Sequence, residues 1–338
     1  MSAHGRPTMV DVARAAGVAV STVSRVANAD PRVGAELADR VRTAIDQLGW
    51  EADDRARHLR LGTSGTIGAV VGELTSTFLR AAERAARSVD LMILATSTEN
   101  DDQLELEAVR SLCRRRVDGL IIEPCGAPAT TAYLAGQIAR GLSVVALDRP
   151  LPGPAPVSDA VIGDNAAGIR LAYDHLVGRG HEHLAYLGDD ERLFTGQQRA
   201  DAFRRCAAAR SHDVRGRVST GAVTPDRVAR ALDRVLDEHP APTALITGNA
   251  TATTLAFRHL GMGLAGLDLV GYDDVAFAAV LDPPRTVIVQ DYAAMGALTL
   301  QMVTTRLADR NLPVRRAVVP VRLLDRGMGV PTGPGSTR

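Results

Sequence analysis

Short polar side chains recur at helical spacing between residues 20 and 28, and their types can hydrogen-bond to nucleic acid. Two helical patterns, about Met9 to Ala16 and Val20 to Asn28, flank a turn at Gly17, which suits the left-handed backbone of a helix end. The outward face of the second pattern holds Val20, Ser21, Thr22, Ser24, Arg25 and Asn28. Hydroxyls, an arginine and an asparagine suit base edges and phosphates, so this face predicts DNA binding. An ordinary helical hairpin is the alternative.

The remaining reactive residues form no catalytic or metal-binding pattern. The three cysteines, Cys113, Cys125 and Cys206, are widely spaced and have no histidine at ligand spacing. His181 and His183 lie in the polar run GRGHEH, which is typical of a helix-to-strand connection. Walker, G-x-S-x-G and H-E-x-x-H motifs are absent from the sequence. We therefore expect a protein that is not an enzyme, with no catalytic residues, no metal and no cofactor.

The segment TMVDVARAAGVAVSTVSRVAN, residues 8–28, resembles the helix-turn-helix of the lactose-repressor (LacI/GalR) family of bacterial transcription regulators. D-V-A-x-x-A-G-V followed by T-V-S-R-V-x-N is a long and specific signature, and the resemblance continues to about residue 326. Thr8 can cap the first helix, with Asp11 near its positive end. The resemblance implies that Thr8 and the exposed face of the second helix contact an operator. Val20 and Ser21 occupy the positions that vary with operator sequence in the family.

A third helix, about Ala35 to Leu48, completes a DNA-binding headpiece that we place at residues 1–50. Gly49 suits the end of this helix, and Trp50, the only tryptophan, is expected to close the small core. The apolar residues expected to pack on the first two helices are Leu37, Val41, Ile45 and Leu48.

Residues 51–62, EADDRARHLRLG, join the headpiece to the body. By composition they are a solvated linker. By resemblance they are the family's hinge helix, which orders on operator DNA and pairs with its dimer mate in the minor groove. Ala56 and Arg57 then match the pair flanking the wedge, and Leu59 matches the leucine that inserts between base steps. The family's usual Pro-Asn pair is replaced here by Ala52-Asp53.

Apolar strand-like runs alternate with helical patterns from Thr66 onward, which predicts an α/β body with parallel sheets covered by helices. The runs lie at 66–71, 91–95, 119–124, 143–148, 160–162, 183–188, 243–247, 267–271 and 286–289. The resemblance makes this body, residues 63–330, two Rossmann-like lobes of the periplasmic-binding-protein type. Lobe 1 would hold about 63–160 and 291–319, and lobe 2 about 161–289 and 320–330. Residues 331–338 read as a disordered tail.

The resemblance also implies an effector cleft between the lobes, at the carboxyl ends of the strands. The residues that match the family's cleft positions are Asp148, Arg199, Asn249, Asp273, Gln290 and Tyr292. Two carboxylates, an arginine and an asparagine suit a polyhydroxylated ligand such as a sugar. For each residue the alternative is a strand-end cap or an interlobe ion pair. Ala250 replaces a family aspartate, and the helix after Phe78-Leu79 is shortened, so a non-sugar or effector-independent regulator remains an alternative.

The charge balance shows that DNA affinity cannot rest on a broad basic field. The 338-residue chain has a formal net charge of zero, and residues 1–62 carry nine arginines against eight acidic residues. We expect local contacts doubled by a homodimer on a palindromic operator. No apolar run approaches the length of a membrane span, so we expect a cytoplasmic repressor without a membrane partner, associated with the nucleoid when bound. A transport-type solute-binding protein is the remote alternative, disfavoured by the headpiece.

Overall fold

The computed structural model describes residues 7–27, 30–51, 63–72, 74, 77–221, 224–261 and 264–327. The chain divides into a first unit, Met1–Ser64, and a second unit, Gly65–Arg338. No helix in the described ranges is both long and apolar enough to span a membrane. The predicted hinge residues Ala56, Arg57 and Leu59, the predicted DNA contact Asn28 and the tail 331–338 lie outside the described residues.

The described residues of the first unit form three helices: α1 (Met9–Ala16), α2 (Val20–Ala27) and α3 (Ala35–Leu48). Thr8 begins α1 with a reciprocal cap, because its hydroxyl accepts from the Asp11 N–H while the Asp11 carboxylate accepts from the Thr8 N–H. Gly17 and Gly49 end α1 and α3 with φ of 64° and 60°, in the left-handed region that glycine adopts without strain. The predicted boundaries of α1 and α3 are therefore confirmed.

The core of this unit is small and centred on three valines. Val12, Val23 and Val41 are fully buried, and Trp50 closes the cluster as predicted. On α3 the buried residues are Ala38, Val41 and Ala44, with Leu37 and Ile45 half-buried. The prediction that Leu48 packs inward is wrong: it is 38% exposed, because the turn at Gly49 directs Trp50 into the space at this end of the core.

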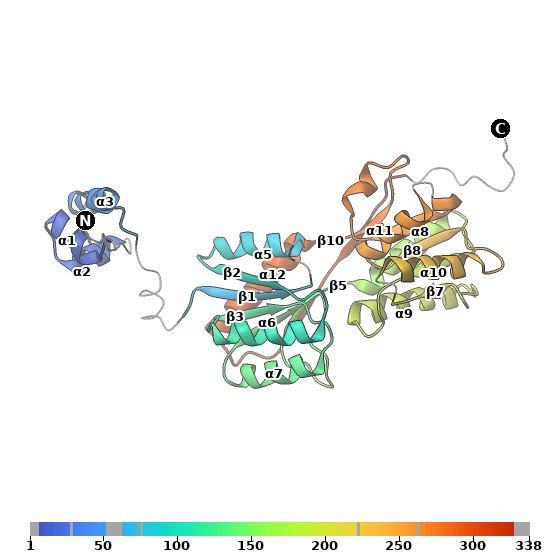
Figure 1. Ribbon diagram of the computed structural model, residues 1–338, viewed down its shortest axis with the longest axis horizontal. Helices are drawn as coiled ribbons and strands as arrows, with labels where there is room; N and C mark the ends of the chain where they lie inside the picture. Colours follow the sequence, from blue (N-terminus) through green and yellow to red (C-terminus); the bar gives the residue numbers. More distant parts are fainter. Residues whose placement is uncertain are drawn as a thin grey trace. The chain divides into compact units, whose positions relative to one another are not determined.

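The second unit contains two six-stranded sheets (Figure 1). The first is wholly parallel, in the order β11-β5-β4-β3-β1-β2, which matches the prediction from continuous apolar runs. Its strands are β1 (Thr66–Val71), β2 (Met92–Ser97), β3 (Gly119–Ile122), β4 (Ser143–Leu147), β5 (Asp159–Gly163) and β11 (Arg316–Val319). Helices α5 (Thr77–Arg87) and α12 (Tyr292–Ala308) cover one face, and α6 (Asp102–Arg114) and α7 (Pro128–Ala139) cover the other.

The second sheet has the order β12-β10-β9-β8-β6-β7. Its strands are β6 (Leu184–Leu187), β7 (Val218–Ser219), β8 (Ala244–Thr247), β9 (Asp268–Tyr272), β10 (Val287–Gln290) and β12 (Val321–Leu324). Helices α8 (Asn165–Gly178) and α9 (Phe194–Ala209) cover one face, and α10 (Pro225–Leu236) and α11 (Ala250–Leu260) the other. Short 3-10 turns lie at Leu264–Gly266 and Ala276–Ala279. β12 runs antiparallel to β10, so the expectation of wholly parallel sheets is wrong for this strand.

The chain passes from one lobe to the other at three places. It leaves the first sheet after β5 for α8, returns after β10 into α12, and crosses again between β11 and β12. The first sheet therefore includes β5 as far as Gly163, and the boundary predicted at about residue 160 falls within this strand. Strands β4 and β9 occupy the same third place in the two sheet orders. Their carboxyl ends, at Leu147 and Tyr272, are followed by Asp148 and Asp273, two of the predicted cleft residues.

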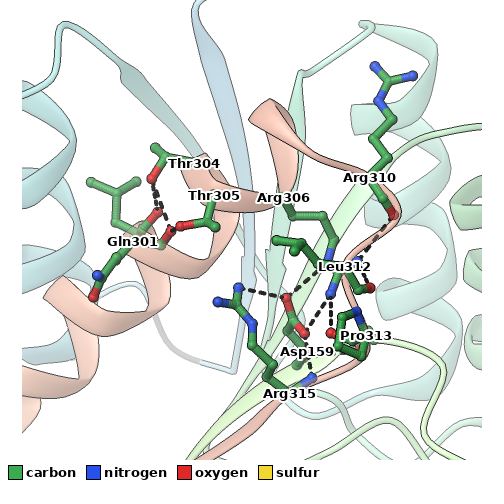
Figure 2. A network of polar contacts seen from close by, with 11 residues as sticks. Asp159, Gln301, Thr304, Thr305, Arg306, Arg310, Leu312, Pro313 and Arg315 are labelled. Atoms are coloured by element: carbon green, nitrogen blue, oxygen red, sulfur yellow. Dashed lines mark hydrogen bonds and ion pairs between the residues drawn. The ribbon is translucent and has the colours of Figure 1, made fainter.

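A buried ion-pair network lies at the end of the first sheet where its parallel strands begin, opposite their carboxyl ends (Figure 2). Asp159, which begins β5 and is fully buried, accepts from Arg306 of α12 at 2.9 Å through both carboxylate oxygens. The backbone N–H of Arg315 donates to the same carboxylate at 2.7 Å, and the Arg306 guanidinium also donates to three backbone carbonyls after α12. Although burial favours protonation, Arg306 and the Arg315 N–H hold the pKa of Asp159 below its ordinary value.

Candidate effector cleft and DNA-binding helix

The predicted DNA-reading face is exposed on α2. Val20, Ser21 and Arg25 are exposed, and Thr22 and Ser24 are half-buried. The inward side of the helix holds Val23, which packs against α1 and α3. Thr8 is exposed, and its hydroxyl lies 2.6 Å from the Asp11 carboxylate, so its first role is to cap α1. An exposed, rigidly supported helix face of this composition can contact the major groove.

All six predicted effector residues line one cavity of about 740 Å³ within the second unit. Asp148 follows β4, Asp273 follows β9, and Asn249 follows β8 and caps α11. Arg199 lies on α9, and Gln290 and Tyr292 flank the passage from β10 into α12. Residues more than a hundred positions apart therefore meet at the carboxyl ends of both sheets, where ligands bind in open α/β folds.

Arg199 is buried and held rigidly at the cavity wall. Its Nε donates to Asn165 Oδ1 and its Nη1 to the carbonyl of Gly248, each at 2.7 Å. Its guanidinium carbon lies 3.7 Å from the centre of the Tyr272 ring, a cation–π geometry. Burial opposes ionisation, but Tyr272, Asp148 and Asp273 raise the pKa of Arg199 above its ordinary value, so the residue keeps its charge. The side chain is fixed for donation into the cavity at low entropic cost.

Asp148 lines the cavity, and its carboxylate is partly exposed there. Its backbone φ of 59° is in the left-handed region, and its buried Oδ1 has no hydrogen-bond partner among the described residues. Burial, reinforced by Glu123 and Asp273 and opposed by Arg199 and Arg149, raises the pKa of Asp148 to about 6. Such a carboxylate is poised to accept a hydrogen bond from a ligand hydroxyl.

Only one of the two carboxylate oxygens of Asp273 is available to a ligand in the cavity. Its Oδ1 accepts from the Tyr292 hydroxyl at 2.8 Å and from Gln290 Nε2 at 3.0 Å. Because Tyr292 begins α12 of lobe 1 and Asp273 follows β9 of lobe 2, the first bond joins the lobes. Burial and the nearby Asp273 charge raise the pKa of Tyr292 above its ordinary value, so it remains a donor. The strand-end role weighed as an alternative for Asp273 is therefore present, and its second oxygen is the one available to a ligand.

Asn249 uses one of its polar groups to cap a helix and has the other available to a ligand. Its Oδ1 accepts from the Ala252 N–H at 2.6 Å and so caps α11, which leaves its amide NH₂ group as the polar group available to a ligand. Ala250, which replaces the family's aspartate, also lines the cavity. The cavity wall at this point therefore has one carboxylate fewer than the family pattern.

The cavity contains residues that sequence reasoning did not select. Arg149 is buried and donates from Nη2 to Glu123 at 2.6 Å and to Asn100 at 3.2 Å. Its position directly after Asp148, in VVALDRP, could have indicated it from the sequence. Asn165, which positions Arg199, was less clearly indicated, by its position directly after Asp164, the N-cap of α8. Nothing local in the sequence indicated Glu123 or Asn100, which line the cavity, or Tyr272, whose buried ring contacts Arg199.

The charges of the cavity favour some ligands over others. The acidic lining residues are Glu123, Asp148, Asp189, Asp273, Asp274 and Asp291, and the basic ones are Arg149, Arg199 and Arg322. Groups of both signs already have partners in the protein: Arg149 pairs with Glu123, and Arg199 binds Asn165 and a backbone carbonyl. Asp274 pairs with Arg326, which does not line the cavity. The excess of carboxylates suits a ligand that donates hydrogen bonds and disfavours an anion.

Other reactive groups in the described ranges are structural. Burial raises the pKa of the Cys125 thiol to about 12, which makes it a poor nucleophile. His181 bonds to Thr243 through Nδ1 and to Asp268 through Nε2, each at 2.9 Å. Residues 261–266, GMGLAG, fit the spacing G-x-G-x-x-G, but they follow helix α11 and precede β9. A dinucleotide-binding motif instead follows a strand and opens a helix.

Comparison with known proteins agrees with this architecture. A family model described as bacterial regulatory proteins, lacI family, matches residues 8–53, and one described as a periplasmic binding protein-like domain matches residues 173–327. The HTH-type transcriptional regulator PtxS of Pseudomonas plecoglossicida is 30% identical over 337 residues, covering 96% of each chain. The ribose operon repressor of Escherichia coli K12 is 27% identical over 330 residues, covering 95% of this chain and 99% of its own.

The fold is shared with a solved structure over nearly its whole length. The lac repressor dimer bound to operator and the anti-inducer ONPF superposes with a TM-score of 0.79 at 22% identity, covering 95% of this chain and 98% of that one. The two sequence relatives regulate transcription and are not enzymes, in agreement with the prediction from the missing catalytic motifs.

Proposed function

The chain belongs to the LacI family of bacterial regulatory proteins and is a DNA-binding regulator of transcription, and from this premise we propose that it is a homodimeric, effector-controlled repressor. The observation that carries the proposal is the exposed α2 face, in a protein whose second unit holds a polar cavity between two lobes. The two headpieces of the dimer bind the half-sites of a palindromic operator, and the site of action is the nucleoid.

In each protomer, the headpiece residues that contact the half-site are Thr8, Val20, Ser21, Thr22, Ser24, Arg25 and Asn28. The hinge residues Ala56, Arg57 and Leu59 contact the minor groove at the centre of the operator. Arg25 is the one charged side chain of the α2 face and the strongest candidate for a direct base or phosphate contact. Valine and serine at positions 20 and 21 discriminate weakly among bases. Specificity therefore depends on Arg25 and on deformation of the central step by Leu59.

The homodimer uses the free edge of the first sheet. β2 is an edge strand, and its Met92 and Leu94 are 68% and 40% exposed, with exposed Val89 just before it. An uncovered apolar edge strand is a hazard for a monomer, because it offers both hydrogen-bond partners and apolar area to another chain. Pairing with a second copy of the chain covers it and gives the symmetry that a palindrome requires.

The effector is an uncharged or amine-bearing polyhydroxylated molecule, most simply a sugar. The polar contacts come from Asp148, Arg199, Asn249, Asp273, Gln290 and Tyr292, with the partly exposed Asp148 carboxylate as an acceptor. The excess of carboxylates in the cavity argues against sugar phosphates and sugar acids. The ribose operon repressor among the relatives supports a small sugar as the first ligand class to test.

Effector control follows from the position of the cavity between the lobes. A ligand that bonds both Asp148 of lobe 1 and Arg199 of lobe 2 stabilises one arrangement of the two lobes. It thereby also fixes the position of β1, the first strand that follows the headpiece along the chain. Its effect on operator affinity is limited to its difference in affinity for the two arrangements. An effector-independent regulator is the second candidate, because Ala250 removes a carboxylate and Asp273 is partly engaged by Tyr292.

Selection of bound duplexes from a random DNA pool tests the DNA-binding half of the proposal. Purified full-length protein is expected to enrich a palindrome with a flexible central step. Failure to enrich any sequence, both without ligand and with added cell metabolites, would contradict a sequence-specific regulator. Enrichment only with metabolites would make the effector a corepressor.

Ligand screening by thermal shift tests the effector half. D-ribose, D-galactose and D-glucosamine should include a ligand that raises the melting temperature of the second unit and changes affinity for the selected operator. D-ribose 5-phosphate serves as the anionic control and should have no effect. Stabilisation by the phosphate instead would overturn the charge argument, and an operator affinity unaffected by every stabilising ligand would favour the effector-independent regulator.

A further inference from the structure

The edge of the first sheet at which its parallel strands begin carries a concentration of arginines that the cavity and the helix-turn-helix do not use. Helices α6 and α7 run back along the sheet and end at this edge, as does α12. The arginines at these ends, which we name the basic edge, are Arg114, Arg115, Arg116, Arg140 and Arg310. All five are exposed, and none pairs with a carboxylate within the part of the chain that the structure describes.

The two parts of the basic edge are neighbours in space. β3 and β4 pair in register, Gly119 with Ser143, so the loops before them, which carry Arg116 and Arg140, end side by side. Arg310 comes from the loop after α12, and its guanidinium lies over Gly141, where an added Cβ would collide with it. Figure 2 shows the Arg310 side chain directed away from the Asp159 network, which binds only its backbone carbonyl. Arg310 is therefore free of the buried ion pairs beside it.

This edge is also where the chain arrives from the DNA-binding headpiece. The backbone N–H of Gly65 donates to Asp118 Oδ2 at 2.7 Å, and the N–H of Asp118 donates to the Thr66 carbonyl at 2.8 Å. The loop that carries Arg114–Arg116 is thus hydrogen-bonded to the segment that leads into β1. Only residues 52–64 separate this point from Glu51, a tether that spans at most about 45 Å when fully extended.

Helix-end electrostatics do not account for the whole feature. A cation in the last turn stabilises a helix through its dipole, which explains Arg114 of α6. Arg116 and Arg310 lie beyond the helices, and Arg116 has a left-handed backbone with φ of 56°. Five unpaired guanidinium groups repel one another, and nearby carboxylates such as Asp118 are already engaged in the sheet edge. Such a cluster matches a polyanion.

We propose that the basic edge binds the sugar-phosphate backbone of duplex DNA next to the operator half-site when the headpiece is bound. The proposal rests on the DNA-binding function proposed above and adds contacts from the second unit to those of the headpiece. Arginine donates bidentately to phosphate oxygens, and contacts of this kind add affinity without reading sequence. Such contacts would raise the DNA affinity of a chain whose residues 1–62 carry a net charge of only +1.

The test compares two full-length triple variants with the same change in charge. R114Q/R115Q/R116Q removes part of the basic edge. R227Q/R230Q/R234Q removes three exposed arginines of α10 in lobe 2 and is the matched control. The probes are the duplex enriched from the random pool, carried with ten base pairs of flanking DNA on each side, and a scrambled duplex of equal length. Affinity is measured at several salt concentrations, and far-UV circular dichroism checks folding.

The edge variant is expected to bind both duplexes roughly tenfold more weakly and to lower the slope of log K against log salt by at least about 0.9, the value for one phosphate contact. The control should leave both quantities unchanged. Equal losses in the two variants would show a net-charge effect and overturn the proposal. Unchanged binding by the edge variant would also overturn it and favour an acidic protein as the partner of this edge. If the wild-type protein enriches no duplex, the proposed function itself fails.

Discussion

Asp148 is the most informative single residue of the cavity, because burial and neighbouring carboxylates act on it together. Its pKa of about 6 in the folded protein lies above the ordinary value of 3.8. A raised pKa means that ionising this carboxyl destabilises the fold, so its unfavourable contribution appears as pH rises from about 4 to about 6 and then stays constant. A ligand hydroxyl that bonds to this carboxylate relieves part of this cost.

We therefore expect Asp148→Asn to stabilise the effector-free protein at neutral pH and to abolish effector binding. The gain in melting temperature over wild type should be near zero below pH 4, grow up to pH 6, and be constant above pH 7. Thermal unfolding followed by circular dichroism across this range is the measurement. A gain that does not vary with pH would show that the benefit comes from packing rather than from the removed charge.

Arg25 carries the charge of the DNA-reading face. Arg25→Ala should weaken operator binding by about 1–3 kcal/mol, because it removes a guanidinium contact to a base or phosphate. The dimer and the thermal stability should not change, since Arg25 is exposed and its neighbour Val23 provides the packing. Gel-shift titration and analytical ultracentrifugation measure the two effects. An operator affinity equal to that of wild type would remove Arg25 from the interface.

At the scale of elements, the three-helix headpiece is expected to have a small free energy of unfolding. Its core is a few valines and alanines closed by one tryptophan, in a unit near the lower size limit for independent folding. The second unit has four apolar clusters on the two faces of its sheets. Damage to the headpiece core is therefore expected to abolish DNA binding while the effector domain remains folded.

Val41→Ala should cost about 2 kcal/mol through lost burial and the cavity it leaves, which is a large share of the stability of so small a unit. Leu48→Ala, at an exposed position on the same helix, is the control and should have little effect. Trp50 is the only tryptophan and lies in this core, so its fluorescence reports headpiece unfolding alone. Equal losses of stability in the two variants would indicate that Leu48 packs inward, as the sequence predicted.

The Asp159 network joins β5, α12 and the segment before β11 (Figure 2). Arg306→Met should destabilise the second unit by about 3–5 kcal/mol, because it leaves a buried carboxylate without its main partner. Adding Asp159→Asn to that variant should recover part of the loss. Urea unfolding followed by circular dichroism measures both. Arg87→Met, which removes an exposed partner of Glu83, is the control for a surface pair; a comparable loss there would contradict a special role for burial.

At the scale of the whole molecule, the proposed dimer connects the body to operator binding. A palindrome is bound tightly only when two headpieces are linked, so the loss of the β2 interface should reduce operator affinity without touching the headpiece. The same sheet has a second edge strand, β11, whose Val318 is also exposed. This second edge provides a control of the same chemistry in the same lobe.

Met92→Asp is expected to convert the dimer to a monomer and to weaken operator binding roughly tenfold or more, because half of the paired contacts are lost. Val318→Asp should leave both the dimer and the affinity unchanged. Analytical ultracentrifugation and operator titration on the same preparations give the two quantities. A dimer that survives Met92→Asp would place the interface elsewhere on the chain.

Much of the architecture was predictable because its causes are local. The Thr8 cap, the glycine ends at Gly17 and Gly49, and the apolar runs that became β1 and β4 depend on residues a few positions apart. Chain-wide resemblance also indicated the six cavity residues, since each lies on, or directly beside, a recognisable strand or helix. Whether they contact an effector stays a prediction, as do the hinge contacts of Ala56, Arg57 and Leu59.

Tertiary structure alone decided the features that depend on distant segments. Leu48 is exposed because Trp50 fills the core, and β12 is antiparallel because the chain turns directly out of β11 into the other sheet. Asp273 is shared with Tyr292 because three chain crossings bring the ends of both sheets to one cavity. Arg149 pairs with Glu123 because β4 and β3, the strands that precede them, are neighbours in the first sheet. The sequence by itself determined which elements form and where each ends. Packing determined which acceptors remain unused, because hydrogen-bond satisfaction depends on neighbours that are distant along the chain.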